Sequence, residues 1–290
     1  MRKLVLFVCF MLLMPCVVWS VEIDDLYFTL SNDYNGDSDN TTGLFDKIDF
    51  YDQSRSTYNI TDVDDLDVGV EFVDVGHALG TKFQRDGSVV LDTEDMASSL
   101  SDLNSWELTF VWELNGEISG IYDVGDTTIV QGSYNSGWVK VYLDETPDAN
   151  FGSDANDIDD DDESTFTDGV LVLEGEVITG DGSFYDFSTT SNFNRTVNLI
   201  LQIDYVDTNY LQSQSFDLGQ LVEMNWLMSV ATEGNNGDSA IGYDDDGYVI
   251  AYGQGTGTLN FSAVPEPATF LLLGGGLFMV GIVTRKRFFK

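Results

Sequence analysis

An acidic run between residues 154 and 163 gathers many side chains that can bind a metal ion. Asp157, Asp159 and Asp161 fit the first, third and fifth positions of a twelve-residue calcium loop. The sixth position holds Asp162 instead of the glycine that makes the turn, and no helical pattern flanks the run. Two interpretations follow: a calcium site at the first three residues, or a solvated loop whose Asp and Asn residues favour turns.

Two other groups of side chains have binding chemistry. Residues 33–39 and 244–247 are shorter acidic turns that also depart from the calcium-loop pattern. Aromatic side chains can stack on sugars, but alternation places Trp106 and Trp112 on the apolar face of a strand. We therefore expect mainly packing roles for four of the tryptophans: Trp106, Trp112, Trp138 and Trp226.

Histidine and cysteine, which often act as catalytic groups, are rare in this chain. His77 is the single histidine, and both cysteines, Cys9 and Cys16, lie within the first 20 residues. This composition excludes a thiol nucleophile and a multi-histidine zinc site from the rest of the chain. No serine has the nucleophile-elbow pattern. Carboxylate pairs suited to glycoside hydrolysis are expected by chance among so many acids, so we expect a non-catalytic protein with no cofactor other than calcium.

Net charge restricts the partners. Residues 21–263 contain six of the 12 Lys and Arg residues but 49 of the 50 Asp and Glu residues, a formal net charge of −43. Nucleic acids and anionic lipids are polyanions that require a basic surface, so neither is an expected partner. Abundant aromatic and branched apolar residues accompany the acids, which favours a folded domain over disorder.

Alternation of apolar and polar residues predicts that the candidate binding residues are positioned by β-strands and the turns between them. Residues 106–114 alternate strictly; Asn115-Gly116 follows, and then residues 118–124, which predicts a hairpin with a type I′ turn. Residues 93–103 are the best helix candidate. The remaining predicted strands are 26–30, 68–73, 127–130, 138–143, 169–178, 196–206, 221–231 and 248–261. We therefore expect an all-β fold, an antiparallel β-sandwich or jelly roll.

We expect residues 21–263 to form one acidic β-rich ectodomain that carries the acidic run as a long loop. A division into two domains near residues 154–163 is the alternative, because that run is too polar to pack.

The N-terminus has the order of a secretory signal peptide. Arg2 and Lys3 precede an apolar run over residues 4–18, and Ser20 is a small residue at its boundary. The run is shorter than the roughly 20 residues that span a bilayer. We expect residues 1–20 to be removed and the exported protein to begin at Val21.

The C-terminus has the features of a second targeting signal. Pro265-Glu266-Pro267 precedes an uncharged apolar stretch, residues 268–284, which is at the short limit for a membrane-spanning helix. The basic cluster that follows favours the cytoplasmic side. We therefore expect a single transmembrane helix over 268–284 and a basic tail over 285–290, which includes Arg285, Lys286 and Arg287.

This segment, residues 264–290, resembles the PEP-CTERM sorting signal in its proline motif, apolar stretch and arginine-rich end. The resemblance implies recognition of Pro265-Glu266-Pro267 by an exosortase, a membrane protease or transpeptidase, in a Gram-negative bacterium that makes exopolysaccharide. It also implies residence in the inner membrane during sorting, and then on the cell surface or in the extracellular matrix. The tail is shared by many unrelated domains, so it implies nothing about the ectodomain.

Two functions remain open at this point. The first is an exported, exosortase-sorted, non-catalytic surface or matrix protein associated with exopolysaccharide, biofilm or flocs. The second is an extracellular hydrolase that acts on polysaccharide from a β-sandwich.

Overall fold

Antiparallel strands make up most of the described chain. The computed structural model describes residues 21–31, 40–92, 106–125, 127–151, 163–185, 194–223, 226–234 and 241–263. The strands are β1 (Val21–Glu22), β2 (Leu26–Phe28), β3 (Lys47–Tyr58), β4 (Glu71–Arg85), β5 (Ser88–Asp92), β6 (Glu107–Val124), β7 (Thr127–Asp144), β8 (Val170–Tyr185), β9 (Asn194–Val206), β10 (Leu211–Ser213), β11 (Trp226–Gly234), β12 (Ile241–Tyr243) and β13 (Val249–Ala263). Within the described ranges there are also three short helices: η1 (Val63–Asp65), η3 (Glu163–Phe166) and α3 (Leu218–Glu223). The predicted all-β, antiparallel class is confirmed.

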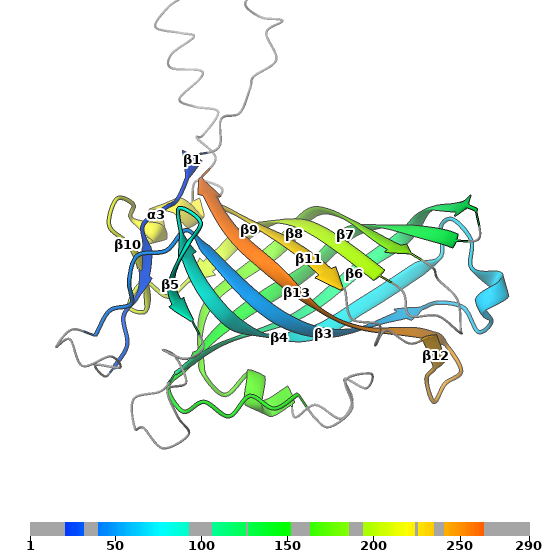
Figure 1. The fold of residues 1–290 in the computed structure, drawn as a ribbon, viewed down its shortest axis with the longest axis horizontal. Helices are drawn as coiled ribbons and strands as arrows, with labels where there is room; N and C mark the ends of the chain where they lie inside the picture. The colour runs from blue at the N-terminus through cyan, green and yellow to red at the C-terminus, as the bar shows by residue number, and fades with distance from the viewer. Residues whose placement is uncertain are drawn as a thin grey trace, which may run out of the picture. The chain divides into compact units, whose positions relative to one another are not determined.

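The main sheet closes on itself. Its strands follow the order β13-β11-β9-β8-β7-β6-β4-β3, and β13 also pairs with β3. The closing register runs from Val249 opposite Tyr58 to Asn260 opposite Lys47. Figure 1 shows β13, β3 and β4 side by side. Each of the eight strands therefore has a hydrogen-bonded neighbour on both sides, and the expected facing sheets of a sandwich are here the opposite walls of one closed sheet.

The predicted hairpin at Asn115-Gly116 is wrong. One strand, β6, runs from Glu107 to Val124, with bulges near Asn115 and again between Ile118 and Gly120. A Cβ on Gly116 would lie 2.5 Å from the ring of Phe72 and 2.6 Å from a backbone oxygen. The glycine is therefore required for close packing inside the sheet, and a bulge accounts for the local irregularity.

Two further expectations are corrected. Residues 127–130 and 138–143, expected as separate strands, are parts of β7. The start of the expected strand 221–231 belongs to α3, and β11 begins at Trp226. The helix α3 carries Leu218 and Leu221, both buried in the core, so Leu221 packs from a helical turn instead of from a strand.

Aromatic residues fill the end of the sheet where β3 begins and β13 finishes. Phe28 stacks on Phe45 at 5.4 Å between ring centroids, and Phe83 and Trp106 complete the cluster. The small sheet of β2 and β10 brings Phe28 to this end. Trp106 is 1% exposed, in agreement with the packing role expected for it.

The described parts of the chain between β7 and β8 cover part of the outer face of β3 and β4. Phe166 of η3 stacks on the ring of His77 at 4.8 Å, and Phe151 packs edge-on against Phe166 and Tyr51. The Oγ1 of Thr109 donates a hydrogen bond to the backbone oxygen of Phe166. These two described pieces, residues 145–151 and 163–169, are called the covering loop below.

Candidate functional site

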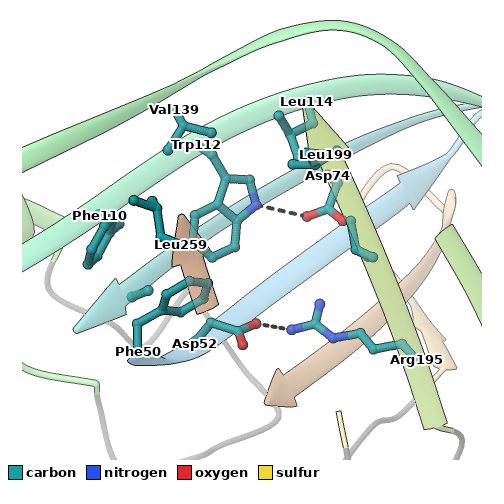
Figure 2. A pocket seen from close by; sticks show the side chains of 12 residues that line it. Phe50, Asp52, Asp74, Phe110, Trp112, Leu114, Val139, Arg195, Leu199 and Leu259 are labelled. Carbon is teal, nitrogen blue, oxygen red and sulfur yellow. Dashed lines mark hydrogen bonds and ion pairs between the residues drawn. The ribbon is translucent and has the colours of Figure 1, made fainter. Parts of the chain in front are cut away.

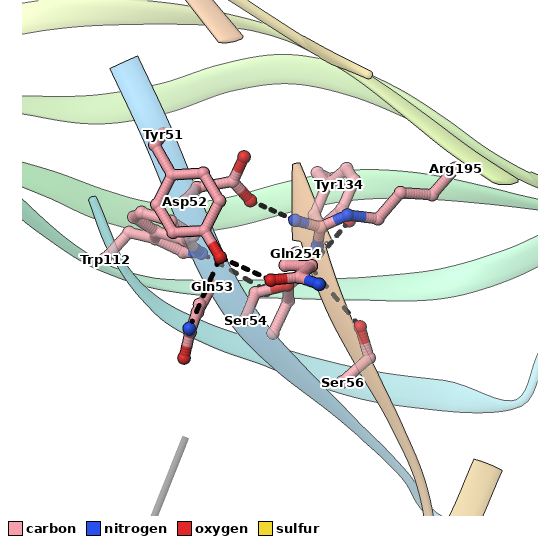
Figure 3. A network of polar contacts seen from close by, with 10 residues as sticks. Tyr51, Asp52, Gln53, Ser54, Ser56, Trp112, Tyr134, Arg195 and Gln254 are labelled. Atoms are coloured by element: carbon pink, nitrogen blue, oxygen red, sulfur yellow. Dashed lines mark hydrogen bonds and ion pairs between the residues drawn. The ribbon is translucent and has the colours of Figure 1, made fainter. Parts of the chain in front are cut away.

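A polar network crosses the interior of the closed sheet. Arg195 of β9 forms an ion pair with Asp52 of β3 and donates a hydrogen bond to Ser54 (Figure 3). The Arg195 side chain is 4% exposed and that of Asp52 is 1% exposed. Gly253 on β13 leaves room for the arginine, since a Cβ there would lie 3.0 Å from its guanidinium.

Asp74 of β4 is the second carboxylate of this network. It accepts hydrogen bonds from Trp112 Nε1 at 3.1 Å, Tyr134 Oη at 3.0 Å and Ser56 Oγ at 3.3 Å. Burial raises the pKa of Asp74 above its ordinary value, and the positive charge of Arg195 and these donors oppose the rise. Burial also raises the pKa of Tyr134, and Asp74 raises it further, so the phenol stays protonated as a donor.

The two members of the ion pair respond differently to burial. Burial raises the pKa of Asp52, although Arg195 acts in the opposite direction. The carboxylates of Asp52 and Asp74 raise the pKa of Arg195 against its own burial. Arg195 is therefore a fixed cation that balances two buried acids only in part.

The cavity beside this network is small. It measures about 40 Å³ and lies between the polar groups and apolar side chains (Figure 2). Such a volume holds a few water molecules and no organic substrate. Asp52 Oδ1 and Arg195 Nε, which belong to lining residues, lack a hydrogen-bond partner among the described residues. The interior network is thus a structural feature with room for solvent.

A cluster of three carboxylates lies at the neck of the covering loop. Glu107 begins β6 and faces Asp144 at the end of β7 in the strand register. Asp148 follows in the loop, and one carboxylate oxygen from each residue lies within 4.8 Å of the others. Glu107 is 8% exposed and Asp144 is 6% exposed, whereas Asp148 is open to solvent.

Hydrogen bonds hold two of these carboxylates by one oxygen each. Glu107 Oε1 accepts the backbone N–H groups of Asp148 at 3.0 Å and Ala149 at 2.9 Å. Asp144 Oδ1 accepts the N–H of Thr146 at 2.8 Å and its hydroxyl at 2.9 Å. Asp144 Oδ2 is buried and has no partner among the described residues.

The cluster has the electrostatics of a cation site. Burial raises the pKa of Glu107, and the carboxylates of Asp144 and Asp148 raise it further, while the two N–H donors oppose the rise. Desolvation raises the pKa of Asp168, at the other side of the loop neck, and Asp144 and Asp148 add to that rise too. Negative potential therefore accumulates here.

An open groove of about 500 Å³ lies at the end of β3, the start of β4 and the middle of β6. Glu71 and Glu117 are exposed and face each other in the strand register. Asn135 and Tyr248 are exposed as well, the tyrosine to 38%. The full lining is Thr57, Tyr58, Asn59, Glu71, Phe72, Val73, Asn115, Gly116, Glu117, Asn135, Ser136 and Tyr248. Amides and hydroxyls here can donate and accept hydrogen bonds, carboxylates can accept them, and an aromatic ring lies beside them.

Several predicted site residues lie outside the described residues. These are the calcium candidates Asp157, Asp159 and Asp161, the sorting residues Pro265, Glu266 and Pro267, and the basic residues Arg285, Lys286 and Arg287. The predicted span 268–284 is also outside, and none of the described helices has the length and apolar character that crossing a membrane requires.

The remaining candidates have packing or turn roles. His77 is buried beneath Phe166. Trp112 packs inside the sheet, and Lys140 lies over the ring of Trp138 at 4.5 Å. In the turn at Asp244, its Oδ1 accepts backbone N–H groups of the same turn.

The cluster of Glu107, Asp144 and Asp148 was not among the predicted site residues. Glu107 and Asp144 are far apart along the chain, and only the β6–β7 register brings them together. A recognisable signal was the position of Asp144 immediately before the turn that contains Pro147.

The comparisons with known proteins concern the C-terminus. A family model described as the PEP-CTERM protein-sorting motif matches residues 263–287, so the predicted resemblance is confirmed and is consistent with an exosortase substrate. The motif indicates export and exosortase-mediated sorting in Gram-negative bacteria. No curated protein and no solved structure matches the chain.

Proposed function

We propose that this protein is exported through a signal peptide, cut after Ser20, and held in the inner membrane by residues 268–284 until an exosortase processes it. The mature ectodomain then resides on the cell surface or in the extracellular matrix. The observation that carries this proposal is the sorting motif over residues 263–287.

We propose further that the ectodomain binds extracellular polysaccharide, as in biofilm or flocs, without acting on it. The open groove supports this proposal through its chemistry, because a sugar presents hydroxyl groups that both donate and accept hydrogen bonds. The exposed amide of Asn135 can do the same, and the ring of Tyr248 offers an apolar face.

A hydrolase acting on polysaccharide remains the second candidate because of one observation. Glu71 and Glu117 are direct cross-strand neighbours in the groove, and such partners have Cβ atoms about 4.5–5.5 Å apart. Retaining glycosidases use such a pair with the two carboxyl groups about 5–5.5 Å apart. In this groove the register fixes the two backbones, and the side-chain rotamers set the carboxyl separation. Incubation of the purified protein with extracellular polysaccharide, compared with Glu71→Gln and Glu117→Gln variants, distinguishes the two candidates by the release of reducing ends.

The sorting step is tested with a double variant, Pro265→Ala with Pro267→Ala. Two prolines keep the segment extended, whereas alanines allow the neighbouring helix to grow through it. The variant is expected to stay in the membrane fraction while the wild-type protein reaches the cell exterior. The control is Glu266→Gln, which changes the same motif but keeps both prolines, so its segment should stay extended. Equal processing of the double variant and the wild-type protein would contradict this mechanism of recognition.

A further inference from the structure

We propose that Glu107, Asp144 and Asp148 bind a calcium ion, which fastens the neck of the covering loop to the first residue of β6. All three residues belong to the described ectodomain, so calcium binding there does not depend on sorting by an exosortase.

The spacing of the three carboxylates fits a single ion. Calcium binds oxygen ligands at about 2.3–2.6 Å, so two oxygens on one ion lie at most about 5 Å apart. The candidate oxygens of Glu107, Asp144 and Asp148 all lie within 4.8 Å of one another. One ion can therefore touch all three side chains.

The buried oxygen of Asp144 is an independent sign of a missing ligand. Asp144 is 6% exposed, and its Oδ2 has no hydrogen-bond donor among the described residues. A buried carboxylate oxygen without a partner is costly, and a cation removes that cost. Asp144 belongs to the carboxylate cluster, so the buried oxygen that lacks a partner is part of the group that would bind the ion.

The hydrogen bonds leave the other oxygens free to act as ligands. Thr146 holds Asp144 by Oδ1, and the loop N–H groups hold Glu107 by Oε1. Each side chain is thus fixed by one oxygen and presents the second. Asp148 is exposed and gives the ion a route from solvent.

The ligand types select calcium. The three side chains offer oxygen only, whereas zinc sites are built largely from histidine and cysteine. Magnesium demands near-ideal octahedral geometry and gives up its water reluctantly, whereas calcium accepts six to eight oxygens in flexible arrangements. Water and loop carbonyl groups would complete the calcium shell, and the charge of −43 over residues 21–263 attracts cations in general.

An ion at this site would join two parts of the fold. Asp148 lies in the covering loop, and Glu107 begins the strand that continues through the closed sheet. On the other side of the neck, a Cβ on Gly169 would lie 2.6 Å from the oxygen of Leu143, so the two ends of the loop are already close. Calcium would add a direct link at that point.

The test uses the full-length protein in detergent, freed of metal with a chelator and then titrated with calcium. The wild-type melting temperature is expected to rise by a few degrees in about 10 mM calcium, because a ligand that binds only the folded state stabilises it. In Asp144→Asn and Glu107→Gln the calcium affinity is expected to fall at least tenfold and this rise to disappear. Both substitutions retain an oxygen for the existing N–H donors.

The variants also distinguish a metal site from a simple acidic cluster. In chelator, Asp144→Asn is expected to melt higher than wild type, because one buried charge is gone, yet to lose the calcium response. The control is Glu176→Gln, an exposed acid on β8, which should keep the full response. The proposal is overturned if wild type melts equally in chelator and calcium, if Asp144→Asn keeps the calcium response, or if sodium at equal ionic strength gives the same rise.

Discussion

Arg195 and Asp52 form a buried ion pair across the closed sheet, although their strands β9 and β3 are not hydrogen-bonded neighbours. The pair therefore joins opposite parts of the wall through the interior. Asp74 lies close enough to act on both residues electrostatically. Removing the arginine would leave two buried acids without their cation.

We expect Arg195→Leu to lower the free energy of unfolding by about 3–5 kcal/mol, the range found when one partner of a buried pair is lost. Urea unfolding followed by tryptophan fluorescence measures this change. Lys47→Met is the control, because its pair with Asp49 is partly exposed and should contribute less than about 1 kcal/mol. Equal effects of the two substitutions would show that the interior pair has no special role.

Asp74 should make stability depend on pH. Because its pKa is raised in the folded state, the folded protein holds a proton that the unfolded chain has released between the two pKa values. The contribution of Asp74 is present at acidic pH and is lost as pH rises through the folded pKa. The free energy of unfolding should thus fall from about pH 4 toward neutrality, and less steeply in Asp74→Asn.

The control for this pH series is Asp245→Asn, an exposed residue with the same change of charge. It corrects for the general relief of repulsion as the many carboxylates become protonated. If both variants show the same slope of unfolding free energy against pH, the buried position of Asp74 is not responsible for the dependence.

Gly76 should tolerate no side chain. A Cβ there would lie 2.1 Å from the indole of Trp112 and 2.7 Å from the backbone oxygen of Gln53. We expect Gly76→Ala to destabilise the fold by about 1–3 kcal/mol, because the indole must move away from Asp74. Gly242→Ala is the control, since its nearest neighbour lies at 3.7 Å. Melting temperatures of the two variants give the comparison.

The strand class was predictable from alternation, but the closure of the sheet was not. The strand β3, which pairs with β13 to close it, was absent from the predicted strands. Its inward positions include Asp52, Ser54 and Ser56, so polar residues occupy the places where alternation requires apolar ones. Because these polar residues are buried in the interior network, β3 lacks the alternating apolar pattern by which a strand is recognised.

The candidate sites also differ in how far the sequence alone could predict them. The sorting segment is continuous, so its order of proline motif, apolar stretch and basic end could be recognised directly. The cluster of Glu107 and Asp144 depends on the register between β6 and β7, which two bulges shift. A local pattern cannot supply that register, since each bulge moves later residues to other partners.

Binding in the groove should depend on Tyr248. We expect Tyr248→Ala to reduce retention of the protein by extracellular polysaccharide at least several-fold, because a stacking ring at the groove is lost. Tyr243→Ala is the matched control, a tyrosine that is 53% exposed and does not line the groove. Co-sedimentation with purified exopolysaccharide measures retention, and equal loss in both variants would assign the effect to general surface change.

The mass of the intact protein recovered from the cell surface tests the central claim most directly. Export and exosortase sorting predict a chain that begins at Val21 and ends at or near Pro265-Glu266-Pro267, without residues 268–290. Intact-mass spectrometry reports both ends in one measurement. A mature surface protein that still carries Lys290 would show the C-terminal segment to be a permanent anchor and would contradict processing by an exosortase.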